Sequence, residues 1–427
     1  MGYLSTLPIS DGATALGLGY CKDASARLYY DDGAAVQGLD FLNWHILADI
    51  AGDLRNNRLK QFLPTYWNAL QLQQAGFSPC RIAIIGDSLS VGQFAQANTS
   101  GQPWYQGAPY QSSLSALLAG LLAGTDSTFF GGVQKSDTGA AGLSHMLSYD
   151  TRISQGAGIG WQTYYIGYPT IGANFDAIGA TATLTFSPVE AWDKVDIYSI
   201  KESGYGSLTL SGAVSGTINS GGFSASGVNV DSFSKSYGTG AITLTPTNEN
   251  HIVGLDFYST TSPKLNVLKL GLGSSTSADW TATGSNWHSL DCLNFIKTSN
   301  PVHLYVLQVG ANDMINNGSG GLSAYISNMQ ALITALQMSS TNPTGGDVLL
   351  VFPPLVNGAS NSVVQLYKNA LWQLARSNGC LFVDAMAAFL NNSYASGKNW
   401  LSVANNVHCS AAGYAALAGY IYASGAP

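Results

Sequence analysis

The sequence predicts an α/β protein built on a parallel β-sheet, with an antiparallel β-sandwich inserted into it. In residues 79–159 and 286–427, short apolar runs alternate with helical segments, which is typical of a parallel sheet with helical crossovers. In residues 160–285, short runs of alternating apolar and polar residues are separated by Gly, Ser and Asn turns. Such runs indicate antiparallel strands. We therefore expect one α/β domain in two pieces around an inserted module.

The composition narrows the class of protein. Only 10% of the 427 residues are charged, and the formal net charge is −7. A surface that is polar through hydroxyl and amide groups suggests an extracellular or virion-associated, glycan-facing protein. No basic run interleaved with aromatic residues is present, so we expect no nucleic-acid binding. We also expect no membrane span, and the first residues show no signal-peptide pattern.

Residues 1–78 form a leader of mixed character. Apolar residues recur near helical spacing between Gly38 and Leu63, which predicts a helix for packing or for homo-oligomerisation.

The sequence offers no metal-binding or disulfide pattern. None of the five cysteines is in CxxC spacing, so we expect mostly buried thiols: Cys21, Cys80, Cys292, Cys380 and Cys409. The histidines are scattered and no carboxylate cluster accompanies them, so we expect no metal and no cofactor.

The first strand of the α/β domain ends in a candidate nucleophile. The apolar run Ile82–Ile85 stops at Gly86-Asp87-Ser88, as expected of a buried parallel strand. Ligand sites of open α/β sheets lie at the carboxyl ends of such strands, where the amides of the next helix face negative charge. Alternatively, Ser88 only caps a helix.

A loop over residues 93–111 follows, and a helix is predicted over 112–122. Its aromatic residues could stack on sugars or pack the loop itself, and Asp87, Trp104 and Tyr105 are the candidates for substrate contacts. The insert begins with aromatic residues that could either stack on sugars or belong to its core: Trp161, Tyr164, Tyr165 and Tyr168.

After the insert, the α/β pattern resumes with predicted helices over 286–297, 321–338, 360–377 and 411–422. The predicted strands are 302–309, 348–352 and 380–383. Gly310-Ala311-Asn312-Asp313 follows the first of these strands, and Asn405-Asn406-Val407-His408 precedes the last helix.

Four ordered blocks of this sequence resemble the GDSL/SGNH hydrolase family. Residues 86–89 (Gly-Asp-Ser-Leu) are similar to its nucleophile block, and residues 137–142 to its glycine block. Residues 310–313 are similar to its Gly-x-Asn-Asp block, and residues 405–408 to its final Asp-x-x-His block. The resemblance covers residues 80–160 and 290–427 approximately, and it implies a flavodoxin-like three-layer fold.

The resemblance also implies site roles. Ser88 would be the nucleophile and His408 its base, while Ser88, Gly142 and Asn312 would donate hydrogen bonds to the oxyanion. The chemistry agrees, because a serine hydroxyl needs a base such as histidine, and attack on an ester carbonyl creates an oxyanion. The plain structural alternatives are a core or helix-capping role for His408 and a turn role for Asn312.

One block departs from the family, because Asn405 stands where the family has Asp. Asn405 could accept a hydrogen bond from the imidazole through its carbonyl oxygen, as in Cys-His-Asn triads. A backbone carbonyl or another carboxylate could instead orient His408, although we expect Asp87, Asp313 and Asp384 to be structural. In a third reading the enzyme is impaired or is a binding remnant.

The leading hypothesis is a serine esterase that removes O-acyl groups, above all O-acetyl groups, from a polysaccharide. The choice of glycan rests on the insert, which resembles carbohydrate-binding modules. One alternative is a phage tail-type receptor-binding protein that retains an esterase fold. Another is a lipase-like esterase acting on small or lipid acyl esters.

Overall fold

The computed structural model describes residues 59–96, 103, 105, 110–129, 134–135, 139–156, 160–164, 174–178, 182–222, 227–283, 289–354, 358–389, 392–403 and 407–424. Several predictions lie outside these residues, namely the leader up to residue 58, Cys21, Trp104, Asp137, Tyr165, Tyr168 and Asn405.

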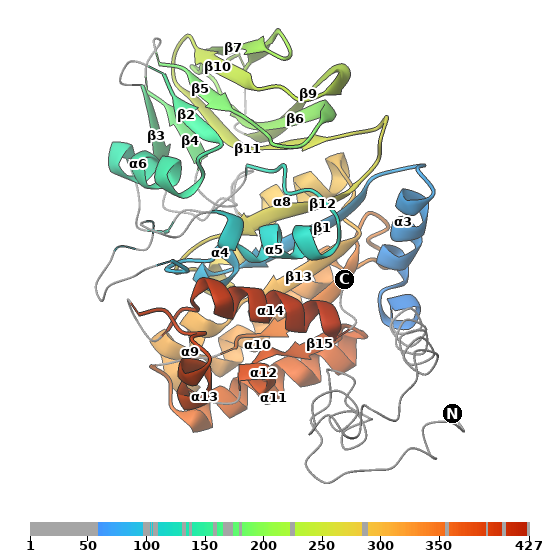
Figure 1. Cartoon of the computed structure of the whole chain (residues 1–427), viewed down its shortest axis with the longest axis vertical. Helices are drawn as coiled ribbons and strands as arrows, with labels where there is room; N and C mark the ends of the chain where they lie inside the picture. The colour runs from blue at the N-terminus through green and yellow to red at the C-terminus, as the bar shows by residue number, and fades with distance from the viewer. Residues whose placement is uncertain are drawn as a thin grey trace, which may run out of the picture.

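A five-stranded parallel sheet forms the centre of the lower part of the molecule in Figure 1. Its strand order is β12-β1-β13-β14-β15, with bounds Leu265–Gly271, Cys80–Gly86, Leu304–Gln308, Asp347–Phe352 and Leu381–Asp384. In sequence order this is 2-1-3-4-5, the flavodoxin-like arrangement. β1, β12, β13 and β14 are buried along their whole length, which explains why they read as continuous apolar runs.

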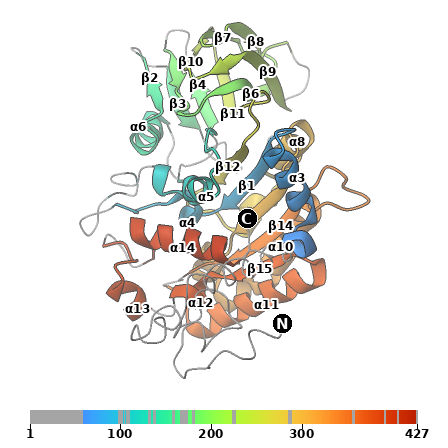
Figure 2. The ribbon, with the colours of Figure 1, turned by 45° about the vertical axis from the view of Figure 1, so that its right-hand side comes forward.

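Helices cover both faces of this sheet (Figure 2). Helix α5 (Leu114–Leu121) packs on β1 and β12 and contacts α14 (Ala411–Ala423), which also contacts α12 (Ala385–Phe389). Helix α10 (Leu322–Leu336) contacts α8 (Ser289–Ser299) and α11 (Asn361–Asn378). From β1 the chain crosses to β12 on one side of β1, and from β12 it returns past β1 to β13, β14 and β15 on the other side. Right-handed crossovers therefore place α5 on one face and the crossover helices α8, α10 and α11 on the other.

Two antiparallel five-stranded sheets form the upper part of the molecule (Figure 1). One has the order β2-β5-β10-β7-β8, with bounds Ile153–Gln155, Leu184–Phe186, Ile242–Pro246, Ser207–Gly212 and Gly216–Asn219. The other has the order β3-β4-β11-β6-β9, with bounds Trp161–Tyr164, Asn174–Ala177, Asn250–Tyr258, Trp192–Lys201 and Gly227–Gly238. Apolar side chains of both sheets join one buried cluster, as in a sandwich.

The sandwich lies between β1 and β12 in the chain, but its limits differ from the predicted 160–285. β2 already belongs to an antiparallel sheet, while β12 pairs in parallel with β1, with Gly86 opposite Gly271. The run over residues 265–272 was thus predicted in the wrong sheet. The pattern of apolar and polar residues in this run could not show which sheet it joins, because an apolar run of that length is compatible with either kind of sheet.

Buried polar contacts join the two parts. Arg81 on β1 lies 3.4 Å from Asp256 on β11, which also accepts a hydrogen bond from Asn266 on β12. A second buried pair, Arg152 and Asp150, lies beside Lys269 of β12. Removing one member of such a pair leaves an uncompensated buried charge, so these contacts hold the sandwich firmly against the sheet.

Among the described cysteines the expected free, buried thiols are found at Cys80, Cys292, Cys380 and Cys409. Within the described part of the chain, every helix is too short or too polar to cross a bilayer.

Candidate active site

Ser88 lies where the sequence predicts it, directly after β1. It is the first residue of helix α4 (Ser88–Val91), and only 9% of its surface is exposed. The chain turns sharply at Gly86, where an added Cβ would lie 2.6 Å from the carbonyl oxygen of Gln308. Ser88 therefore lies at the switch point between β1 and β13, where ligands of such sheets bind.

Asp87 caps this helix. Its Oδ1 accepts a hydrogen bond from the backbone N–H of Leu89 at 2.9 Å, and the residue is fully buried. Burial raises the pKa of the Asp87 carboxyl to about 7. The structure thus gives Asp87 a capping role, while a contact of its carboxyl with substrate stays a prediction.

His408 meets Ser88 from the far end of the chain. Its Nε2 lies 2.8 Å from Ser88 Oγ, which is the hydrogen-bond distance that a serine nucleophile and its base require. Burial lowers the pKa of His408 to about 4. The imidazole is therefore neutral at ordinary pH and able to accept the hydroxyl proton. Asn405 lies outside the described residues.

The turn after α4 holds the histidine loop in place. Three successive carbonyl oxygens, of Gln93, Phe94 and Ala95, accept hydrogen bonds from the histidine-bearing segment, donated by Tyr414 Oη, Ser402 Oγ and the N–H of Ala411. The Phe94 ring packs against the His408 ring, with centroids 4.7 Å apart. Phe94 has a φ of 61°, which is costly for an aromatic residue.

Asn312 comes from the neighbouring strand. β13 ends at Gln308, Gly310 has a φ of 133° that favours glycine, and Asn312 is the second residue of α9 (Ala311–Asn317). Asn312 Nδ2 donates to the carbonyl oxygen of Ser275 at 2.9 Å. One hydrogen of this amide thus anchors the side chain, and the second is available to another acceptor.

The segment after β12 is the third wall of the site, and the sequence analysis missed it. The N–H of Leu272 donates to the carbonyl oxygen of Gly86, and Ser274 has a φ of 64°. Asp313 accepts hydrogen bonds from the N–H and Oγ of Ser277, which starts α7 (Ser277–Trp280). The carboxyl ends of β12, β1 and β13 therefore meet here. A prediction that residues 265–271 pair with β1 would have included this segment in the site.

Gly142 is a buried residue of helix α6 (Gly139–Tyr149), which packs on β3. This helix is joined to α4 by a hydrogen bond from Tyr149 Oη to the carbonyl oxygen of Val91. A role for the Gly142 amide in an oxyanion hole therefore stays a prediction, whereas the backbone after β12 lies beside Gly86.

The side chains of two of the aromatic candidates are described. Tyr105 stacks on His145 of α6, with ring centroids 3.7 Å apart. Trp161 is buried in the sandwich core, where its indole N–H donates to the carbonyl oxygen of Ala182. Trp161 is therefore a core residue, the second of its two predicted readings.

Comparisons with known proteins agree with this geometry. Residues 244–416 match the GDSL-like Lipase/Acylhydrolase family. The match contains Asn312 and His408 but not Ser88, since the sandwich separates the first strand from the others. No curated protein sequence matches the chain.

Among solved structures, a peptidoglycan O-acetylesterase has a similar fold, with a TM-score of 0.61 and 16% identity over 84% of this chain and 94% of that one. A carbohydrate acetylesterase family member from Sinorhizobium meliloti aligns over 36% of this chain and 76% of its own, with 19% identity and a TM-score of 0.27. Residues 244–416 are thus similar to GDSL-like lipases and acylhydrolases, and the chain shares its overall fold with the first of these structures.

Proposed function

We propose that this chain is a serine esterase that hydrolyses O-acyl esters, above all O-acetyl esters, on a polysaccharide. The single observation that carries the proposal is the 2.8 Å contact between His408 Nε2 and Ser88 Oγ at the carboxyl edge of the sheet. The family match supports acyl hydrolysis in general. A polysaccharide substrate is suggested by the peptidoglycan O-acetylesterase, whose fold is similar over 84% of this chain.

In the proposed mechanism, His408 takes the proton of Ser88 as the hydroxyl oxygen attacks the ester carbonyl. The resulting oxyanion accepts hydrogen bonds from the second Asn312 amide hydrogen and from the N–H groups at the start of α4 and after β12. His408 then returns the proton to the departing sugar hydroxyl. Water, activated by the same imidazole, releases the acid from the acyl-enzyme.

The test is acid release from a panel of esters. Acetate release would be measured from O-acetylated peptidoglycan, xylan, pectin and capsule, beside p-nitrophenyl esters of short and long acids. We expect release from at least one acetylated polysaccharide and a preference for short acyl groups. Hydrolysis of long-chain esters with every acetylated polysaccharide left intact would favour the lipase-like alternative and reject the polysaccharide substrate.

The activity should persist at unusually low pH. Only the neutral imidazole accepts a proton, and the pKa of His408 is lowered to about 4 by burial. We therefore expect kcat/KM for a non-ionising ester to stay level as the pH falls past 6.5, and to decline only as it approaches 4.

Asn405→Asp provides the matched variant for this pH profile. A carboxylate hydrogen-bonded to the imidazole would stabilise the imidazolium form. We expect activity at neutral pH to be kept or raised, and the acid limb to move to higher pH. An unchanged acid limb would mean that position 405 does not contact His408.

Phe94 is expected to position the histidine. Phe94→Leu removes the tilted ring contact with the imidazole and admits water, so the pKa of His408 should rise and kcat should fall roughly 10- to 100-fold. Phe94→Tyr keeps the ring and should retain activity. The measurement is the pH profile of kcat for both variants; a lower kcat with an unshifted profile would contradict a positioning role.

A further inference from the structure

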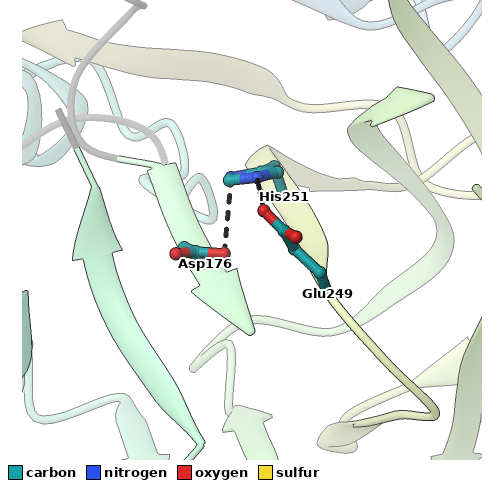
Figure 3. Close-up of side chains that lie close together, drawn as sticks. All are labelled: Asp176, Glu249 and His251. Atoms are coloured by element: carbon teal, nitrogen blue, oxygen red, sulfur yellow. Dashed lines mark hydrogen bonds and ion pairs between the residues drawn. The ribbon is translucent and has the colours of Figure 1, made fainter. Parts of the chain in front are cut away.

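Three side chains of ligand type gather in the sandwich, away from the residues described above. Asp176 lies on β4, His251 lies directly opposite it on β11, and Glu249 immediately precedes β11. One ligand atom from each residue lies within 4.8 Å of the other two. Figure 3 shows both carboxylates turned toward the imidazole. The sequence analysis expected no carboxylate cluster beside a histidine, because strand pairing, not spacing, creates this one.

The separation of Asp176 from His251 matches that of two ligands around one metal ion. His251 Nδ1 lies 3.5 Å from Asp176 Oδ1, while Glu249 Oε1 lies 3.3 Å from the other ring nitrogen, Nε2, and would move toward Nδ1 to join the site. Two ligands at about 2.1 Å from a tetrahedral zinc ion lie ~3.4 Å apart. Asp176 is 3% exposed, and its Oδ1 has no hydrogen-bond partner among the described residues. A buried carboxylate oxygen in this state calls for a partner.

The surroundings resemble the outer support of a metal site. Gln162 Nε2 donates to Asp176 Oδ2 at 2.6 Å, which leaves Oδ1 facing the imidazole. Metal-bound carboxylates are commonly held in this way by a second hydrogen-bonding residue.

We propose that Asp176, Glu249 and His251 bind a divalent transition-metal cation, Zn²⁺ by preference. Asp176 Oδ1, His251 Nδ1 and one oxygen of Glu249 would be the protein ligands, with water in the remaining position. An imidazole with two carboxylates suits Zn²⁺, whereas Ca²⁺ and Mg²⁺ prefer oxygen ligands throughout. The Glu249 side chain is 55% exposed, so it is able to swing toward Nδ1 when the ion enters.

The ion would hold the outer hairpin of the sandwich. β3 lies at the edge of its sheet, and β4 joins β11 through three residue pairs, from Asn250 to Ile252. Ligands from β4, from β11 and from the turn before β11 would bind this hairpin to the sheet. Since the folded state alone assembles the three ligands, Zn²⁺ should raise the melting temperature in a concentration-dependent way.

The full chain is first stripped of metal with a chelator, and the chelator is then removed. The metal-free protein is titrated with ZnCl₂ by calorimetry. We expect a saturable site in the wild type, a higher melting temperature with Zn²⁺, and no such effect of Ca²⁺ or Mg²⁺ at equal concentration. Glu249→Gln changes an exposed side chain, so it should fold normally and bind Zn²⁺ roughly 100-fold more weakly. Gln162→Leu should weaken binding about 10- to 100-fold.

His145→Asn is the matched control, because it removes a histidine outside the cluster, and it should bind Zn²⁺ as the wild type does. Equal affinity of the wild type and Glu249→Gln, or no saturable binding by the wild type, would overturn the proposal. The readouts are binding and melting, so they stand apart from the proposed esterase activity.

Discussion

Ser88→Ala is expected to abolish ester hydrolysis, with a loss in kcat of at least about 10⁴-fold. The substitution removes the oxygen that would attack the ester carbonyl and that lies 2.8 Å from His408 Nε2. The measurement is the steady-state rate on p-nitrophenyl acetate and on the best acetylated polysaccharide. A serine-reactive fluorophosphonate should label the wild type and not the variant.

Ser90→Ala is the matched control for this experiment. Ser90 is also a buried serine of α4, but its Oγ donates to the carbonyl oxygen of Asp87 at 2.8 Å. We expect Ser90→Ala to keep kcat within a few-fold of the wild type. A Ser88→Ala protein that folds, as its circular dichroism would show, and still releases acetate would reject the serine mechanism.

Asn312→Ala is expected to lower kcat by about 10²- to 10³-fold with little change in KM. The reason is that its amide would donate to the oxyanion, which exists only after the attack on the carbonyl. Separate kcat and KM values on p-nitrophenyl acetate test this directly. A raised KM with kcat unchanged would assign Asn312 to ground-state binding.

The loss of the bond to Ser275 needs its own control, since Asn312 also anchors that segment. Asn328→Ala removes a comparable amide contact, from Nδ2 to Ser277 Oγ at 3.0 Å, without removing a donor at the site. We expect its kcat to stay within about tenfold of the wild type. Equal losses in the two variants would mean that Asn312 acts by holding the loop.

Much of the parallel sheet could be predicted because its strands are buried on both faces. Residues 302–309 and 348–352 read as unbroken apolar runs, and the structure places β13 and β14 there. The helix predicted over 360–377 became α11 (Asn361–Asn378), capped by Ser360 and ended by Gly379. Burial of a strand and capping of a helix both produce local sequence patterns, so these elements could be predicted from the sequence.

No local sequence pattern indicates which distant strands pair. Residues 265–271 are as apolar as a sandwich strand, and only their hydrogen bonds to β1 show that they belong to the parallel sheet. The same pairing places the segment after β12 beside Gly86, whereas Gly142 lies in a helix that packs on the sandwich. The local sequence of a glycine-rich stretch does not indicate which strand it will lie beside.

By itself, the sequence determined the kind of chemistry that this chain offers: a serine after a buried strand, an asparagine after another, and a histidine before the last helix. Those are properties of residue type and local order. The tertiary structure alone decided which backbone completes the site, that Phe94 packs on His408, and that Asp176 faces His251. Such contacts join residues far apart in the chain, and their geometry depends on sheet register and layer packing, which no local pattern encodes.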